Sequence, residues 1–213
     1  MLVSRVNIDD INDLAAISKT LDVLSSHQID KANWDETSVQ KPKASFKIGH
    51  NGTHLFLQYF VEENEILAIT TEDNGAVWTD SCVEFFIQFT NSDYYYNLEL
   101  SCIGKALFGY RKERKNVVYA DSEIMSSIRR YPSLGEKNFD KKQGDFKWNL
   151  LVIIPASAYW QSEITSFDRV KAKANFYKCG DNLTKPHYLS WNPIRSEKPN
   201  FHIPDYFENI TFE

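Results

Sequence analysis

Two glutamates lie at matching positions in neighbouring strand-like stretches of the sequence. Residues 78–89 and 94–100 both alternate between apolar and polar side chains at the period of two that is typical of β-strands. The four residues that separate them, Thr-Asn-Ser-Asp, are turn formers. If the two stretches form a hairpin around this turn, Glu84 lies directly opposite Glu99.

Opposed carboxylates need something that relieves their repulsion. Side chains directly across an antiparallel pair have Cβ atoms about 4.5–5.5 Å apart, where like charges are unfavourable. A cation, a shared proton, a nearby lysine or arginine, a hydroxyl-rich ligand or exposure to water would each relieve it. Trp78, ahead of the first strand, favours a ligand. An aromatic plate beside carboxylates and the amide of Asn97 suits a sugar ring, because the plate stacks on its C–H face while the polar groups bind its hydroxyls.

Further candidate residues lie nearer the C-terminus. Asn175 and Tyr177 share one face of an alternating strand and could reach the same concavity, although structural hydrogen bonding is an equal alternative. His187, Trp191 and His202 lie close together in the sequence and could line the pocket. A metal site there is disfavoured, because no third ligand appears at a usable spacing, and a packed tryptophan with two surface histidines is the alternative.

The two glutamates also allow a catalytic alternative. Retaining glycoside hydrolases hold their carboxyl groups about 5–5.5 Å apart, and Glu84 and Glu99 could serve as such a pair. Neighbouring strands reach that distance without any catalysis, however, and the sequence has no Ser-His-Asp order, phosphate loop, dinucleotide fingerprint or metalloprotease helix. Non-catalytic binding is therefore favoured over a hydrolase and over a protein-interaction domain with a degenerate sugar site.

Composition excludes several classes of partner. The 213 residues carry a net charge of −5, which gives no electrostatic footprint for nucleic acid. The longest apolar run, residues 150–155, is far shorter than the roughly 20 residues of a membrane span. The first residues lack a signal-peptide pattern, so a cytoplasmic location is expected.

Three widely spaced cysteines argue against a disulfide framework or zinc site and predict buried thiols. Oligomeric state is left open.

The strand and turn pattern predicts an all-β fold. Residues 44–50 and 53–61 flank Asn51 and Gly52, the strongest short hairpin signal. Roughly nine to eleven strands separated by turns indicate a β-sandwich or jelly roll of two mostly antiparallel sheets, with small helical or loop insertions. We expect one domain, 1–213, made of an N-terminal helical arm at 1–30 and the sandwich at 31–213.

Three segments are predicted to lie outside the strands of the sandwich. A short helix is predicted from Asp9 or Asp10 to about Leu24. Residues 62–76 are polar and turn-rich, and we interpret them as a loop that delivers Trp78 to its strand. Residues 111–145 are charged and weakly periodic. Their first five residues, RKERK, are interpreted as a solvated loop or edge rather than a phosphate-binding patch.

Several motifs, taken in order, resemble a known family. They are WTDSCVEFFIQF, YYNLEL with a following glycine, NFYKCGD, PHYLSWNPI and NFHIPDYFENITF, and they span the chain from about Trp34 to the C-terminus. Together they resemble the family 9 carbohydrate-binding modules, most closely the shorter stand-alone bacterial relatives. The resemblance implies a DOMON-like β-sandwich, a slot with two aromatic walls that holds a sugar chain end, and structural calcium. Its ligands are not placed, and the acids between Glu62 and Asp80 are candidates.

The resemblance assigns roles to individual residues. Trp78 matches the first aromatic wall, and Glu84 matches the carboxylate that binds sugar hydroxyls. Asn97 lies near a polar position of the slot. Phe201 stands where the family has its second tryptophan, and this smaller ring without an indole N–H predicts weaker binding. His202 beside it has no counterpart in the family pattern. The implied partner is a mono- or oligosaccharide.

Overall fold

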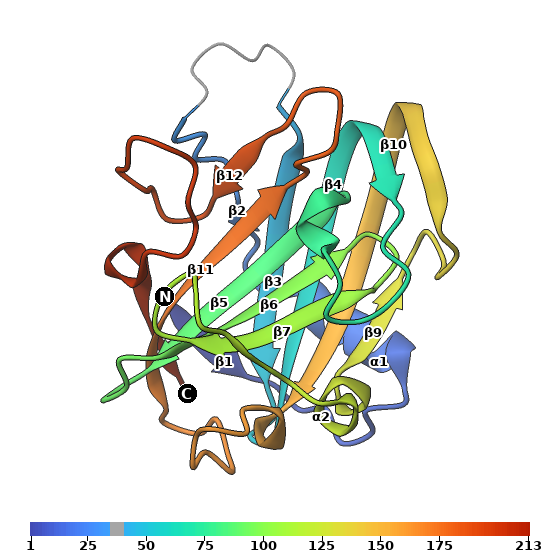
Figure 1. The fold of residues 1–213 in the computed structure, drawn as a ribbon. Coiled ribbons are helices and arrows are strands. Elements are labelled where there is room, and N and C mark those ends of the chain that lie inside the picture. Colours follow the sequence, from blue (N-terminus) through green and yellow to red (C-terminus); the bar gives the residue numbers. More distant parts are fainter. Residues whose placement is uncertain (35–40) are drawn as a thin grey trace.

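The computed structural model describes residues 1–34 and 41–213, in which two β-layers pack face to face (Figure 1). The first layer contains β5 (Cys82–Phe89), β6 (Tyr95–Ser101), β7 (Ala106–Arg111), β8 (Val118–Tyr119), β11 (Lys171–Cys179), β12 (Tyr188–Ser190) and β13 (Glu208–Phe212). The second contains β2 (His27–Gln28), β3 (Lys43–His50), β4 (His54–Ala68), β9 (Arg129–Pro132) and β10 (Phe139–Pro155), and β1 (Leu2–Arg5) joins the layers. The helices are α1 (Leu14–Asp22) and α2 (Ser122–Ser127), with short 3-10 turns η1 (Val77–Thr79), η2 (Ala156–Ala158) and η3 (Pro204–Tyr206).

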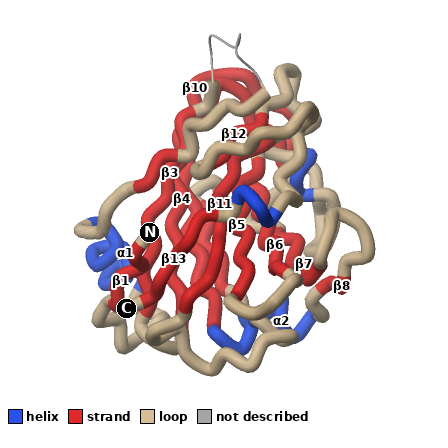
Figure 2. Tube along the Cα trace, turned by 90° about the vertical axis from the view of Figure 1, so that its left-hand side faces the viewer, coloured by secondary structure: helices blue, strands red, loops and turns tan. Residues whose placement is uncertain are grey.

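The strand order is β8-β7-β6-β5-β11-β13-β1-β3-β4-β10-β9. Neighbours in this order are antiparallel except at β1, which pairs in parallel with both β13 and β3. The pairing of β1 with β13 places the two chain ends side by side, as Figure 2 shows. The predicted all-β sandwich is confirmed, with thirteen strands in the described residues instead of nine to eleven. Every described helix is too short or too polar to cross a membrane.

Both predicted hairpins form. β5 and β6 pair in the expected register, whereas β3 and β4 pair His50 with Leu55, across a loop longer than the Asn51–Gly52 pair. Gly52 lies in the turn between β3 and β4 with φ at 97°, a conformation that a residue without Cβ adopts readily. β5 pairs with β6 so that Glu84 lies opposite Glu99 and Phe86 lies opposite Asn97. The alternation of apolar and polar side chains therefore fixes which residues of β5 and β6 share a face.

The strands β4 and β10 are longer than the sequence pattern suggests. The loop prediction for residues 62–76 is wrong over its first part, because β4 continues to Ala68. Its polar second half pairs with an equally polar first half of β10, which begins at Phe139. Cross-strand partners such as Glu62 and Lys147, 2.8 Å apart, replace the hydrophobic alternation by which a strand is normally found.

The N-terminal helix is shorter than predicted. Its N-cap is Asp13 rather than Asp9 or Asp10, and the Asp13 carboxylate accepts a hydrogen bond from a backbone amide of the first turn at 2.9 Å. The helix packs its buried face, including Ile17, against the outside of the second layer. Residues 1–30, expected as a helical arm, also contribute β1 and β2 to the layers.

The two faces of the first layer differ in what covers them. Alternate residues of β5 point between the layers, where Phe85 and Phe46 both stack on Phe176 with ring centroids 4.9 and 3.7 Å apart. The intervening residues, among them Glu84, point outward. A C-terminal segment, residues 194–207, packs apolar side chains over part of this outer face. Polar residues on the rest of the face therefore lie beside an aromatic cluster.

Candidate functional site

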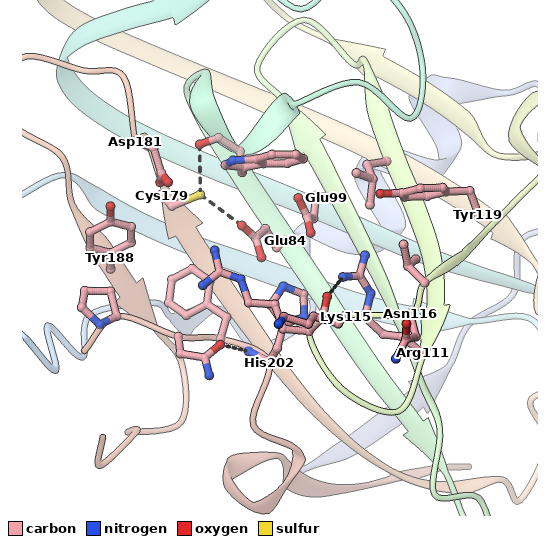
Figure 3. Close-up of a pocket in the computed structure, with 17 residues that line it drawn as sticks. Glu84, Glu99, Arg111, Lys115, Asn116, Tyr119, Cys179, Asp181, Tyr188 and His202 are labelled. Atoms are coloured by element: carbon pink, nitrogen blue, oxygen red, sulfur yellow. Dashed lines mark hydrogen bonds between the residues drawn. The ribbon is translucent and has the colours of Figure 1, made fainter. Parts of the chain in front are cut away.

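A cavity of about 370 Å³ lies over the outer face of β5, β6 and β7. It has an acidic floor, an aromatic rim and a basic side, which Figure 3 shows together. Its lining residues are Trp78, Glu84, Glu99, Leu107, Arg111, Arg114, Lys115, Asn116, Val117, Tyr119, Cys179, Asp181, Tyr188, Pro199, Asn200, Phe201 and His202. The volume falls in the range of small-molecule sites, about 300–1,000 Å³.

The floor is built from the two opposed glutamates. Glu84 and Glu99 are 3% and 4% exposed, so both carboxyl groups are almost removed from water. Oε1 of Glu99 accepts a hydrogen bond from Nδ2 of Asn97 at 2.9 Å, while its Oε2 has no partner. Oε1 of Glu84 accepts from Sγ of Cys179 at 3.1 Å. The floor therefore has one oxygen that nothing in the described protein satisfies.

Burial makes both carboxyl groups poor acids. The pKa of Glu84 is raised well above 4.5 by desolvation, reinforced by the neighbouring Cys179 and Glu99. Desolvation also raises the pKa of Glu99 to about 7, against the opposing effects of the Arg111 guanidinium and the Asn97 amide. The pair therefore retains at least one proton near neutral pH, which relieves much of the repulsion expected between two ionised carboxylates.

Trp78 forms the exposed aromatic part of the rim. It lies in the turn η1 and is 37% exposed, although the preceding Val77 is fully buried. The Trp78 carbonyl accepts a hydrogen bond from the amide of Asp181 at 3.2 Å. The Asp80 carboxylate accepts two more from backbone amides at 3.0 Å each. These anchors hold the indole beside the floor without covering it.

The basic side of the cavity begins at Arg111, at the end of β7. Arg111 is only 6% exposed, and its Nη1 donates to the carbonyl of Arg114 at 2.8 Å while its Nε has no partner. A Cβ on Gly109 would lie 2.7 Å from Oδ1 of Asn97 and 3.0 Å from Nη2 of Arg111. The absence of a side chain at Gly109 therefore leaves room for the guanidinium over the sheet.

The C-terminal segment supplies the opposite wall. The Phe201 ring is 8% exposed and stacks on Tyr177 with centroids 4.1 Å apart and planes 10° from parallel. Most of this ring is therefore used in packing. The adjacent His202 shares a hydrogen bond between its Nδ1 and the Tyr95 hydroxyl at 2.9 Å. Burial lowers the pKa of His202 to about 3, so this ring is neutral at neutral pH.

Comparison with known proteins identifies the family. The sequence matches the model of carbohydrate-binding family 9 over residues 15–212. The chain belongs to this family. It is 37% identical to a candidate carbohydrate-binding protein from Bacteroides uniformis, with a TM-score of 0.95 over 100% of this chain and 98% of that one. No match was found among curated proteins.

Two more distant family 9 structures share the fold. They are those of a module from Caldicellulosiruptor kristjanssonii in complex with cellotriose and with glucose, at 9% and 10% identity. Their TM-scores are 0.58 and 0.55, and the matches cover 100% of this chain and 93% and 95% of those chains. The family 9 resemblance deduced from the sequence motifs is thereby confirmed.

The cavity brings together only some of the residues that the family pattern and the sequence suggested. Trp78, Glu84, Glu99, Phe201 and His202 line it, and Asn97 supports Glu99 from behind. Four other candidates, Asn175, Tyr177, His187 and Trp191, do not line it.

The positions of these four residues explain their separation from the cavity. Tyr177 lies beneath the Phe201 ring, which stacks on it. Asn175 is fully buried and donates to the carbonyls of Asn192 and Tyr206. Trp191 packs edge-on against aromatic rings of the core. His187 lies 3.0 Å from Nζ of Lys178, beside a different hollow.

The sequence interpretation missed the basic side of the cavity. Arg111, Arg114 and Lys115 come from the RKERK run, which forms a loop as predicted but faces the cavity. The other overlooked lining residues are Leu107, Asn116, Val117, Tyr119, Cys179, Asp181, Tyr188, Pro199 and Asn200. The order of the strands could have revealed this side, because the run begins at the end of β7, and β7 pairs with β6, the strand that carries Glu99.

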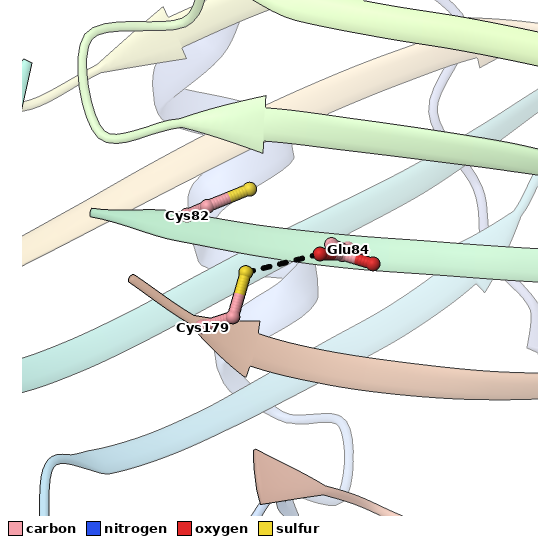
Figure 4. A group of neighbouring side chains, drawn as sticks. All are labelled: Cys82, Glu84 and Cys179. Atoms are coloured by element: carbon pink, nitrogen blue, oxygen red, sulfur yellow. Dashed lines mark hydrogen bonds between the residues drawn. The ribbon is translucent and has the colours of Figure 1, made fainter. Parts of the chain in front are cut away.

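One group of side chains has the spacing of metal ligands. The ligand atoms of Cys82, Glu84 and Cys179 all lie within 4.8 Å of one another (Figure 4). Two thiols and a carboxylate suit a thiophilic ion such as zinc rather than calcium. Burial raises the pKa of Cys82 to about 11, so its thiol is protonated at neutral pH. All three cysteines of the chain are buried and free, as expected.

Five of the six candidate calcium ligands between Glu62 and Asp80, all except Glu72, have other partners among the described residues. Between Glu62 and Asp80, Glu63 pairs with a lysine at 2.8 Å and Asp73 pairs with Arg130 at 2.7 Å. The Asp80 oxygens accept from backbone amides. Calcium needs six to eight converging oxygens. In the described chain, these residues therefore do not fit the calcium site that the family resemblance implied.

Proposed function

We propose that this family 9 protein binds a sugar, or the end of an oligosaccharide, in the cavity beside Trp78 without cleaving it. The ring would lie against the indole, and its hydroxyls would bond to the floor formed by Glu84 and Glu99. Arg111 would donate to the same hydroxyls from the basic side.

Two polar atoms without partners carry this proposal. Oε2 of Glu99 and Nε of Arg111 are buried and make no hydrogen bond, although both residues line the cavity. A buried polar atom left unsatisfied costs about 1–3 kcal/mol. A sugar hydroxyl donates to a carboxylate oxygen and accepts from a guanidinium N–H, so neighbouring hydroxyls of one ring could satisfy both.

The exposed indole and the solved relatives support the same class of ligand. Trp78 presents more than a third of its surface beside the floor. An aromatic face beside a few convergent polar groups is what a sugar ring requires. The family 9 module of Caldicellulosiruptor kristjanssonii has been solved with cellotriose and with glucose.

Family membership favours binding without turnover, because the matched family is one of carbohydrate-binding modules. A retaining hydrolase uses one ionised carboxylate as the nucleophile and one protonated carboxyl as the acid. Burial raises the pKa of both Glu84 and Glu99, that of Glu99 to about 7, so a turnover assay, and not the protonation state, separates the two functions.

Calorimetric titration of glucose and cellotriose tests the proposal. The wild type should bind at least one of them, and Trp78→Ala should weaken binding at least about tenfold. Tyr94→Ala is the matched control, because Tyr94 is 44% exposed but does not line the cavity. Absence of binding at millimolar sugar would refute the proposal. Turnover of an aryl glucoside that disappears in Glu84→Gln would instead support the hydrolase.

A further inference from the structure

The RKERK run (residues 111–115) has one cation that forms an ion pair at the surface and three that line the cavity. Lys112 pairs with Asp93 at 2.7 Å and does not line the cavity. Arg114 and Lys115 do line it, and within the described residues neither forms an ion pair with a carboxylate. Arg111 lies below them with its unpartnered Nε. Three cationic side chains therefore face one side of the sugar site.

The acids of the cavity neutralise these cations only in part. Its acidic lining residues are Glu84, Glu99 and Asp181, and burial raises the pKa of Glu84 well above its usual range and that of Glu99 to about 7. Two of the three cations are arginines, whose guanidinium groups stay charged at any relevant pH. Even with Asp181 ionised, the three cations outnumber the charged acids of the cavity near neutral pH, although the whole chain carries a net charge of −5.

The labelled charges lie on different sides of the paired glutamates. Figure 3 shows Asp181 and Tyr188 on one side of Glu84 and Glu99, and Arg111 and Lys115 on the other. Arg114 lies close enough to Asp181 and Glu99 for its charge to lower the pKa of both carboxyl groups. A neutral sugar would leave Arg114 and Lys115 without an ion pair in the described chain.

We propose that the saccharide bound here carries an anionic group, a carboxylate or a phosphate, held by Arg114 and Lys115. The inference rests on the proposed function and adds the class of sugar to it. The ring contacts Trp78, its hydroxyls bond to Glu99 and Arg111, and its anionic group points toward the RKERK loop. A guanidinium binds either anion through two parallel hydrogen bonds, and such charge-assisted bonds are stronger than neutral ones.

Matched neutral and anionic sugars test this inference by calorimetry. The probes are glucose with glucuronate, galactose with galacturonate, glucose 6-phosphate, and inorganic phosphate alone. At least one anionic sugar should bind about tenfold more tightly than its neutral counterpart, and added salt should reduce the difference. The uronates and the sugar phosphate distinguish a carboxylate from a phosphate as the group recognised.

Variants of the loop locate the effect. The double variant Arg114→Gln, Lys115→Gln should lose the preference for the anionic sugar over the neutral one, both measured on the same variant. Both side chains are exposed, so the variant should fold, which thermal unfolding would verify. Lys112→Gln is the control within the same loop and should retain the preference.

The outcomes separate this inference from the proposed function. Equal or tighter binding of the neutral sugars would overturn the inference and leave sugar binding intact. Inorganic phosphate that binds as tightly as glucose 6-phosphate would also overturn it, because the loop would then recognise the anion without the ring. Failure of every sugar to bind would refute the proposed function, and the inference with it.

Discussion

Two buried polar clusters lie on opposite faces of the first layer and differ in how their charges are paired. On the inner face, Nζ of Lys178 lies 2.8 Å from Oε2 of Glu63 and 3.0 Å from Nε2 of His187, and it donates to the carbonyl of Cys179 at 2.9 Å. Trp148 donates its indole N–H to the other oxygen of Glu63 at 2.7 Å. This cluster joins the two layers, because Glu63 and Trp148 belong to the second layer.

The cluster on the outer face is incomplete. Glu84 and Glu99 oppose each other as like groups, and Oε2 of Glu99 and Nε of Arg111 lack partners. The inner cluster places a lysine and a glutamate in contact, while the outer cluster places acidic and basic side chains around a cavity without an ion pair between them in the part of the chain that the structure describes. The difference teaches that burial alone does not mark a binding site. Buried groups mark one when the protein leaves them unsatisfied beside open space.

The largest effect should come from breaking the inner cluster. Lys178→Met leaves the Glu63 carboxylate buried without its cation, which should lower the free energy of unfolding by about 3–5 kcal/mol. Denaturant unfolding measures this loss. Lys171→Met, an exposed lysine of the same strand, should change stability by less than about 0.5 kcal/mol. Equal effects of the two variants would show that the inner pair has no structural role.

A pH dependence of stability should come next in size and belong to the outer cluster. The folded pKa of Glu99 is about 7 against an ordinary 4.5, so the folded state holds an extra proton between these values. Its contribution to stability is fully present below pH 4.5 and is lost as the pH rises through 7, by at most about 3 kcal/mol.

The control for this prediction is a variant that cannot titrate at the same position. Glu99→Gln should flatten the decline in the free energy of unfolding between pH 4.5 and 7, measured by denaturant titrations at several pH values. A wild-type curve that matches the variant throughout this window would contradict the raised pKa.

The smallest effect should be a loss of sugar affinity without loss of stability. Glu99→Gln keeps the shape of the side chain but weakens hydrogen bonds from sugar hydroxyls, so affinity should fall about tenfold. Calorimetry with the tightest-binding sugar measures the change. Glu197→Gln, at an exposed position outside the cavity, should bind as the wild type does. A destabilised Glu99→Gln with unchanged affinity would make the outer cluster structural like the inner one.

Local sequence pattern predicted the parts of the fold that depend on short-range alternation. The hairpin of β5 and β6, and with it the opposition of Glu84 and Glu99, follows from period-two alternation around a four-residue turn. The second half of β4 was missed, because its polar residues are stabilised by partners on β10 that lie about 70 to 85 positions away. No local signal reports such a partner.

The candidate site was predictable only in part for a related reason. Trp78 and Glu84 lie in one motif and could be recognised together. Tyr177 also points to the outer face, but the C-terminal segment covers it with Phe201, and alternation cannot reveal which residues a distant segment covers. The direction in which Arg114 and Lys115 point likewise depends on tertiary contacts of the loop.

The structure of a sugar complex tests the central claim most directly. We predict a ring against Trp78, with sugar oxygens within about 3.2 Å of both Oε2 of Glu99 and Nε of Arg111. A sugar bound elsewhere, or one that leaves these two atoms without partners, would contradict the account.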